Sequence, residues 1–392
     1  MIRFLTAGES HGKALTCIIE GFPAGIEISE EFINEELKRR KLGYGRGPRM
    51  KIEADTVEIL SGVRFGKTLG SPITLQIKNR DWENWTEKMS VEKIEKDIEK
   101  IEVVRPGHAD LVGTLKYKFD DVRNSIERSS ARETAARVAA CAVAKKFLSY
   151  FNIEIGSFVE SMLGVYPEDN FYHKLLKNEI PADFSASQIN NISDNFELRV
   201  LDEEHNIKLK EIVRSHAAKG ETVGGTFVTV ATGVPLGLGS YMHFDRKLNA
   251  KISFYISSIN AVKAVEIGGG TICSQMPGSQ VTDDIVIENN KIKHLTNYAG
   301  GIEGGISNGM PIIVRAAMKP IPTVKVPKKT INIIKFENSE TRYERSDVSA
   351  VPACAVISES MLAWALSEAF LEKFSGDSIT EILKNYRSSQ ND

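Results

Sequence analysis

The pattern of apolar and polar residues predicts strands in four stretches near the N-terminus, and the last two alternate clearly with a period of two. These stretches are residues 2–6, 14–20, 51–60 and 71–78. Between the second and the third, Ser29 is a good helix cap and predicts a helix that runs to about Arg40. The chain is therefore expected to mix strands and helices.

Later stretches have the patterns of helices of different kinds. An apolar stripe at helical spacing runs from Val91 to Ile101 behind Ser90 and predicts an ordinary amphipathic helix. Residues 135–148 are apolar nearly all round and mostly small, which is typical of a buried helix that packs closely on its neighbours. A closing helix is expected over residues 358–374.

The 392 residues contain nothing that resembles a linker, so we expect one compact domain, 1–392, of the α/β (α+β) class. Residues 163–200 are polar and irregular and are interpreted as an insertion. Two strand-like runs end in Gly-x-Pro-x-Gly, at 21–25 and 233–237, and a helix is expected after each. This repetition suggests two structurally related halves.

Composition excludes several classes of function. The formal net charge of −2 gives the whole chain no attraction to nucleic acid or to an anionic membrane. The four cysteines are far apart and lack CxxC spacing, which fits a reduced, cytoplasmic protein and argues against a zinc site. Neither a signal peptide nor an apolar run of about 18 residues is present, so we expect neither secretion nor a membrane span.

Groups that bind anions are concentrated just before the small-residue helix. The motifs are Arg-Pro-Gly-His-Ala-Asp at 105–110 and Arg-Ser-Ser-Ala-Arg-Glu-Thr at 128–134. Ser129 and Ser130 are good caps, and the free N–H groups of a first helical turn attract phosphate or carboxylate. The alternative is a solvated basic face that opens a core helix.

Arginines supply two further candidate anion sites. Arg128 and Arg132 would lie one helical turn apart and form a bidentate clamp. Residues 38–51 carry seven basic residues and no acidic one, among three glycines. This stretch suits a mobile lid over an anionic substrate, and the alternative is an exposed basic loop. Its arginines are Arg39, Arg40, Arg46 and Arg49.

Glycine-rich loops provide the remaining candidates. The loop at 8–12 brings Ser10 and His11 close to a ligand, although a loop histidine is more often structural or merely exposed. Residues 299–309 contain five glycines, and a loop of this kind can wrap a planar ring or a phosphate. The strand that follows leads to a cation and a hydroxyl within residues 319–323.

Together these stretches closely resemble the chorismate synthase family over almost the whole chain. The long motifs are residues 8–12 with 20–25, 105–110 with 128–134, and 345–347 with 349–352. Shorter matching pieces are 260–261, 299–301, 304–305 and 319–320. Departures such as Cys141 and Ala264, where the family usually has glycine, remove no expected catalytic group.

The resemblance implies the last common step of the shikimate pathway. This step is the 1,4 elimination of phosphate and the C6 hydrogen from 5-enolpyruvylshikimate 3-phosphate, and it requires reduced FMN (FMNH2) without net redox change. NADPH would be an indirect source of reducing equivalents through an external flavin reductase, because the chain shows no reductase domain. The family also implies a homotetramer and a single β-α-β sandwich, with antiparallel sheets around buried helices and pseudo-twofold halves.

The resemblance also implies roles for individual residues. His11 would deliver a proton to the departing phosphate or to the flavin, His108 would lie beside the pyrimidine end of the isoalloxazine, and Asp347 would be the base that acts through flavin N5. FMN would be held by Arg128, Ser129, Ser130, Asn260, Ala261, Gly304, Lys319, Pro320, Ile321, Pro322, Thr323 and Arg345. Substrate or NADP would be bound by Ser10, Arg40, Arg46, Arg49, Arg105 and Arg132.

Two other classes of function compete with this interpretation. One is another flavin or nucleotide oxidoreductase that uses the same anion clamps. The other is a non-catalytic binder of phosphate-rich ligands or RNA. RNA-binding proteins usually interleave aromatic with basic residues, whereas the basic stretches here contain only Tyr44 among glycines.

Overall fold

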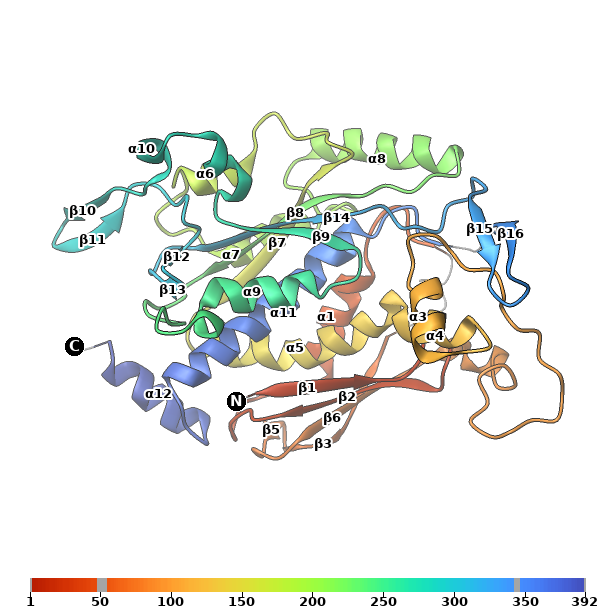
Figure 1. Ribbon diagram of the computed structural model, residues 1–392. Helices are drawn as coiled ribbons and strands as arrows, with labels where there is room; N and C mark the ends of the chain where they lie inside the picture. Colours follow the sequence, from red (N-terminus) through yellow and green to blue (C-terminus); the bar gives the residue numbers. More distant parts are fainter. Residues whose placement is uncertain (1, 48–54, 342–345, 391–392) are drawn as a thin grey trace.

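Two antiparallel sheets enclose a layer of helices in the computed structural model, which describes residues 2–47, 55–341 and 346–390 (Figure 1). The first sheet has the order β1-β2-β6-β3, with β1 (Arg3–Ala7), β2 (Ala14–Glu20), β6 (Ile73–Lys78) and β3 (Val57–Ser61). The second has the order β7-β8-β14-β9, with β7 (Glu154–Met162), β8 (Gly225–Thr232), β14 (Ile312–Met318) and β9 (Val262–Ile267). Between them lie α1 (Glu30–Lys41), α5 (Thr134–Ser149), α9 (Leu248–Ser257) and α11 (Val351–Lys373). The predicted sandwich is confirmed.

Shorter elements surround these layers. The helices are η1 (Arg80–Asn84), α3 (Asp110–Tyr117), α4 (Arg123–Ser129), η2 (Ala131–Glu133), α6 (Phe171–Leu176), α7 (Ala186–Ser193), α8 (Glu203–Ala218), η3 (Phe244–Arg246), η4 (Gly270–Gln275), α10 (Gly278–Val281) and α12 (Ile379–Ser388). The paired strands are β4 (Val63–Arg64) with β5 (Lys67–Thr68), β10 (Ile285–Glu288) with β11 (Lys291–His294), β12 (Ile302–Glu303) with β13 (Ile306–Ser307), and β15 (Lys329–Asn332) with β16 (Glu337–Glu340).

The two halves share one order of principal elements. The first half runs β1, β2, α1, β3, β6, α5, and the second runs β7, β8, α9, β9, β14, α11. In each sheet the fourth of these strands pairs between the second and the third. The repeated Gly-x-Pro-x-Gly lies after β2 in one half and after β8 in the other. The prediction of two structurally related halves is therefore confirmed.

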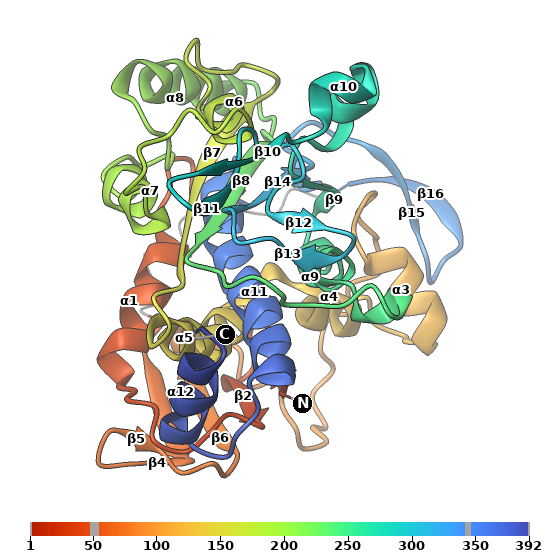
Figure 2. The same ribbon diagram turned by 90° about the vertical axis from the view of Figure 1, so that its left-hand side faces the viewer.

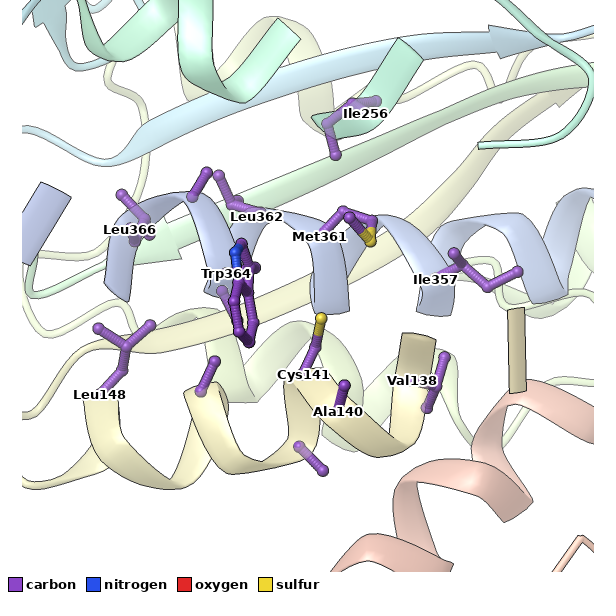
Figure 3. Packing of buried hydrophobic residues seen from close by; sticks show 14 of the residues in the cluster. Val138, Ala140, Cys141, Leu148, Ile256, Ile357, Met361, Leu362, Trp364 and Leu366 are labelled. Atoms are coloured by element: carbon purple, nitrogen blue, oxygen red, sulfur yellow. The ribbon is translucent and has the colours of Figure 1, made fainter. Parts of the chain in front are cut away.

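The core is centred on the last helix of each half. Most side chains of α5 are buried, as the run of small residues predicts, and small residues let α5 and α11 approach closely. Figure 3 shows Trp364 extending from α11 toward α5, and Cys141 extending from α5 toward α11. By length and composition α11 could cross a membrane, but 89% of its most apolar window is buried inside the protein. Its apolar surface is therefore used in packing between the two sheets.

One predicted helix does not form. Residues 91–101, all of which the structure describes, contain no helix. Val91 is 86% exposed, and only Ile101 at the end of the stripe joins a buried cluster, with Val104 and Val122. Helical spacing stabilises a helix only when its apolar face is covered, and here most of the stripe has no surface to cover it.

The polar segment interpreted as an insertion, residues 163–200, contains two short helices. Its helices α6 and α7 bury Tyr172, Leu175 and Ile189 in a second apolar cluster with Phe158 of β7 and Ile313 of β14. Figure 2 shows α7 beside β7. Although the segment is mostly polar, these few apolar residues are enough to pack it against the second sheet. That the segment is an insertion relative to the family stays a prediction.

A buried ion cluster joins the helices of the two halves. Glu359 of α11 is fully buried, and its carboxylate lies 2.8 Å from Arg39 Nη1, 2.7 Å from Lys145 Nζ and 3.2 Å from Arg199 Nη2. Burial alone would raise the pKa of Glu359, but these three cations hold it well below its usual value. Arg39 therefore has a structural position, and the prediction that it belongs to a basic lid is wrong.

Replacing Glu359 by glutamine should lower the free energy of unfolding at pH 7 by about 3–5 kcal/mol, because it leaves buried cations without their counter-ion. The pKa of Glu359 is lower in the folded protein than the unfolded value of about 4.3. Its ionised carboxylate therefore stabilises the folded protein above that pH, and this stabilisation is lost as the pH falls below it. Urea unfolding of the unaltered protein and of Glu359→Gln should therefore show a difference in the free energy of unfolding that becomes smaller at acid pH. Glu372→Gln on the same helix, where the side chain is 37% exposed, is the control and should cost about 1 kcal/mol or less. Equal losses would contradict the prediction.

Candidate functional site

A cavity of about 950 Å³ lies where segments of both halves meet at the N-terminal ends of α5 and α11. Its volume is at the upper end of the usual range for small-molecule sites, roughly 300–1,000 Å³. Of the residues predicted to form a site, it is lined by Ser10, His11, Arg40, Arg46, Arg105, His108, Ser129, Ser130, Arg132, Asn260, Ala261, Lys319, Ile321, Pro322, Thr323 and Asp347. Segments more than 300 residues apart in the sequence therefore converge on one hollow.

Five predicted residues are not among those that line it. Arg128, Gly304 and Pro320 do not reach the cavity wall, and Gly304 lies in the turn between β12 and β13. Arg49 and Arg345 lie outside the described residues.

The predicted clamp of Arg128 with Arg132 is wrong. Ser130 has an extended backbone, φ −62° and ψ 139°, so α4 ends before the turn that contains Arg132. Arg128 instead donates a hydrogen bond to the carbonyl oxygen of Thr6 at 2.9 Å. Ser130 does act as a cap, accepting from the backbone N–H of Arg132, whereas the hydroxyl of Ser129 donates to a carbonyl of its own helix.

His11 is fixed by groups on two sides. Its Nδ1 lies 2.8 Å from Glu127 Oε1, and its backbone N–H donates to Glu127 Oε2 at 2.7 Å. The imidazole stacks on Trp85 with a centroid separation of 3.9 Å. Nearby, the hydroxyl of Ser10 donates to that of Ser130 at 3.1 Å. The first loop of the chain is thus held against α4.

The second histidine shares a buried carboxylate with an arginine. Asp110 Oδ1 lies 2.5 Å from His108 Nδ1, and Asp110 Oδ2 accepts from Arg105 Nε at 2.8 Å. Burial would raise the pKa of Asp110, but hydrogen bonds from His108 and Arg105 hold it well below its usual value. An ionised Asp110 therefore orients the side chains of His108 and Arg105, which both line the cavity.

Two buried arginines share another carboxylate. Asp55 lies 3.2 Å from Arg40 Nη1 and forms an ion pair with Arg132 Nη1. Burial lowers the pKa of Arg40 to about 10, opposed by Asp55 and assisted by the positive charges of Arg132 and Arg46. Arg40 nevertheless stays charged at neutral pH. Two fixed guanidinium groups therefore face the cavity with only one carboxylate between them.

Asp347 lines the cavity from the segment that leads into α11. Its Oδ2 pairs with Arg46 at 2.9 Å, and its Oδ1 accepts from the backbone N–H of Gly47 at 2.6 Å. The carboxylate side chain is 22% exposed. It is therefore held in one orientation and can still be reached by a ligand.

The rest of the cavity lining combines apolar side chains with a few polar groups. Lys319 Nζ donates to the carbonyl of Gly107 at 2.6 Å, and Asn260 Nδ2 donates to that of Ser129 at 3.1 Å. The larger aliphatic side chains of the lining are Ile126, Ile259, Met318, Ile321 and Ile357. Such a wall suits a flat apolar ring that carries a polar tail.

Charge distinguishes this cavity from an ordinary apolar pocket. Among the described residues that line it, the cations are Arg40, Arg46, Arg105, Arg132 and Lys319, and the carboxylates are Asp81 and Asp347. These cations outnumber the carboxylates and are held in place by their partners. The cavity is therefore suited to phosphate and carboxylate ligands.

Sequence reasoning missed the residues that orient the predicted ones. Glu127 and Asp110 lie within or next to the motifs already recognised, so an acidic residue beside a histidine or arginine motif was an available signal. Asp81 and Trp85 belong to η1 and its cap, a region to which no pattern assigned chemistry. Asp55 gave no signal, because only the fold brings it to Arg132.

Comparisons with known proteins agree with this geometry. A family model described as chorismate synthase matches residues 2–371. The chorismate synthase of Geobacter metallireducens is 49% identical, and the alignment covers 98% of each chain. That of Aquifex aeolicus is 50% identical over 100% of this chain and 98% of its own. A crystal structure of chorismate synthase superposes with a TM-score of 0.79 at 42% identity, covering 100% of this chain and 97% of that one.

Proposed function

Because the chain belongs to the chorismate synthase family, whose activity is that of a lyase acting on phosphates in the shikimate pathway, we propose that the cavity between its halves is the active site. The reaction eliminates phosphate and the C6 hydrogen from 5-enolpyruvylshikimate 3-phosphate and yields chorismate. The observation that carries the proposal is that His11, His108, Arg132 and Asp347, from four separate segments, line one cavity.

The arginines are proposed to bind the substrate's phosphate and its two carboxylates. Arg40 and Arg132 are buried and ion-paired, so they are held in place before a ligand arrives. Each charged contact of this kind contributes about 1.5–3 kcal/mol. Arg46 and Arg105 line the same cavity and add to its positive charge. Arg49 is proposed to join them, so that Arg49→Ala would mainly raise KM.

The apolar part of the lining fits reduced FMN. The isoleucines and Met318 suit its ring system, and Ser129, Asn260, Lys319 and Thr323 offer groups for its polar parts. When bound, the reduced cofactor supplies the electron chemistry of the elimination. The protein's part is to hold substrate and cofactor side by side and to exclude water.

Two residues are proposed to handle protons. His11 offers a ring nitrogen to the cavity, and an imidazole can release a proton to the leaving phosphate near neutral pH. Asp347, held by Gly47 and Arg46, is proposed as the group that takes up the proton lost from C6. His108, oriented by Asp110, is proposed to lie beside the cofactor.

Assembly, location and the route of electrons complete the proposal. We infer a homotetramer in the cytoplasm, supplied with reduced FMN by an external flavin reductase that uses NADPH. The four cysteines, all without disulfide partners, support a reducing compartment.

The decisive experiment is anaerobic incubation with photoreduced FMN and 5-enolpyruvylshikimate 3-phosphate. Phosphate release equal to the chorismate absorbance is expected. Steady oxidation of NADPH without phosphate release would instead support a flavin oxidoreductase, and ligand binding without turnover would support a non-catalytic binder.

Lys319→Ala should raise the dissociation constant of FMN by about 10- to 10²-fold, since a contact between a cation and a phosphate or ring oxygen contributes about 1.5–3 kcal/mol. Titration of FMN fluorescence measures this directly. Lys328→Ala, an exposed lysine a few residues further on that does not line the cavity, is the control. Unchanged FMN affinity in Lys319→Ala would remove Lys319 from the cofactor site.

A further inference from the structure

Two residues that line or back the cavity hold the imidazole of His11, and their contacts define what that ring can do. We propose that Glu127 and Trp85 are positioning residues of His11: Glu127 determines which ring nitrogen carries hydrogen, and Trp85 determines the plane of the ring. This inference deepens the proposed function and rests on it only for its effect on turnover.

Glu127 makes two contacts with one residue. Its side chain is only 2% exposed, one oxygen lies 2.8 Å from His11 Nδ1, and the other accepts from the backbone N–H of His11 at 2.7 Å. The backbone carbonyl of Glu127 also accepts from the N–H of Ser10 at 3.1 Å. The loop at 8–12 has no regular secondary structure of its own, so α4 supplies the rigid support.

The carboxylate fixes the tautomer by simple donor and acceptor chemistry. An ionised carboxylate can only accept hydrogen bonds, so Nδ1 must carry the hydrogen. In the neutral ring Nε2 is then the unprotonated nitrogen, and in the cation Nε2–H is the proton that can be given away. The nearest carboxylate to Nε2, Asp81 Oδ2, is 4.0 Å away, beyond hydrogen-bonding distance. Nε2 is therefore available to a ligand.

Trp85 fixes the remaining freedom, rotation of the imidazole about the bond that joins the ring to Cβ. The two rings are nearly parallel, with planes 20° apart. Trp85 is itself held, because its Nε1 donates to Asp81 Oδ2 at 3.0 Å and the guanidinium of Arg123 lies 5.2 Å from its ring centroid. That separation is within the range of cation–π interactions. The indole is thus a fixed surface and not a mobile neighbour.

Nuclear magnetic resonance of protein labelled with ¹⁵N-histidine tests the tautomer without any substrate. The chain has seven histidines, and the His11 signals are identified by their loss in His11→Ala. We expect the neutral ring of His11 to carry its hydrogen on Nδ1 in the unaltered protein. A hydrogen on Nε2 with Nδ1 bare would overturn the inference, whatever reaction the protein catalyses.

Glu127→Gln tests the consequence for turnover. Glutamine has one accepting oxygen and a donating NH2 group, so it can keep only one of the two contacts, and the NH2 group favours the opposite tautomer. By analogy with residues that orient metal-bound histidines, we expect kcat to fall about 10- to 10²-fold. KM and FMN affinity should change less than about threefold. Glu133→Gln is the matched control, a buried glutamate that contacts Thr6 and Arg137 and does not line the cavity.

The role of Trp85 is tested by two substitutions that differ in the size of the side chain they leave. Phenylalanine keeps a flat surface, so Trp85→Phe should retain kcat within about threefold, whereas Trp85→Ala should lower kcat about 10-fold. Trp82→Ala, in the same short helix but outside the cavity lining, is the control. Unaltered kcat in Glu127→Gln or in Trp85→Ala would overturn the corresponding role. Failure of the unaltered protein to form chorismate would overturn the proposed function. It would not decide the tautomer of His11, which the magnetic resonance experiment measures independently.

Discussion

His11→Ala is expected to lower the turnover of chorismate formation by about 10²- to 10⁴-fold while FMN still binds. The reason is that His11 is the one imidazole in the described part of the cavity that is held by a buried carboxylate and by a stacked indole with Nε2 left available. Its removal takes away a placed proton donor and leaves the arginines that line the cavity intact. Substrate affinity should therefore change much less than kcat.

The measurement is phosphate release under anaerobic conditions with reduced FMN in excess, together with an FMN titration of the same preparation. His243→Ala is a suitable control, because His243 is an exposed histidine paired with Asp245 far from the lining. Turnover of His11→Ala near that of the control would remove His11 from the mechanism. Loss of FMN binding in the variant would mean instead that the loop at 8–12 is structural.

The order of strands and helices within each half could be predicted from the sequence, because it depends on local patterns. Alternating strands, the cap at Ser29 and the run of small residues that became α5 each report which face of an element is buried. The repeated Gly-x-Pro-x-Gly marks the same turn in both halves. Periodicity failed at 91–101, since the number of apolar residues in a stripe does not reveal whether another element covers it.

The site itself could not be predicted from periodicity. Motifs and the family resemblance point to its residues, and the structure adds the carboxylates that hold them: Asp55 pairs with two arginines, Asp110 with His108, and Glu127 with His11. Each of these carboxylates is buried, and a buried charge must be paired. Which cation it pairs with depends on contacts between distant segments. The clamp expected of Arg128 failed for a similar reason, because one extended residue, Ser130, separates two helical turns that the pattern joined.

Asp347→Asn is expected to lower turnover by about 10²- to 10⁴-fold, and its geometry makes the cause separable from simple misfolding. Asparagine can keep an oxygen on the N–H of Gly47, since it has the same shape as aspartate. Its NH2 group, however, would face the guanidinium of Arg46, and the variant can neither pair with Arg46 nor accept a proton as a carboxylate does. Loss of the proton acceptor can therefore change kcat, and loss of the ion pair with Arg46 can change KM.

The two reasons predict different results. If Asp347 takes up a proton, Asp347→Asn lowers kcat, and adding Arg46→Ala to that variant does not restore kcat. If Asp347 only holds Arg46, the two substitutions have overlapping effects on KM, and a double-mutant cycle shows this as strong coupling in KM with kcat little changed. Asp194→Asn is the matched control, because Asp194 also pairs with arginines, Arg39 and Arg199, but lies outside the cavity lining. A kcat for Asp347→Asn equal to that of Asp194→Asn would exclude Asp347 as the base.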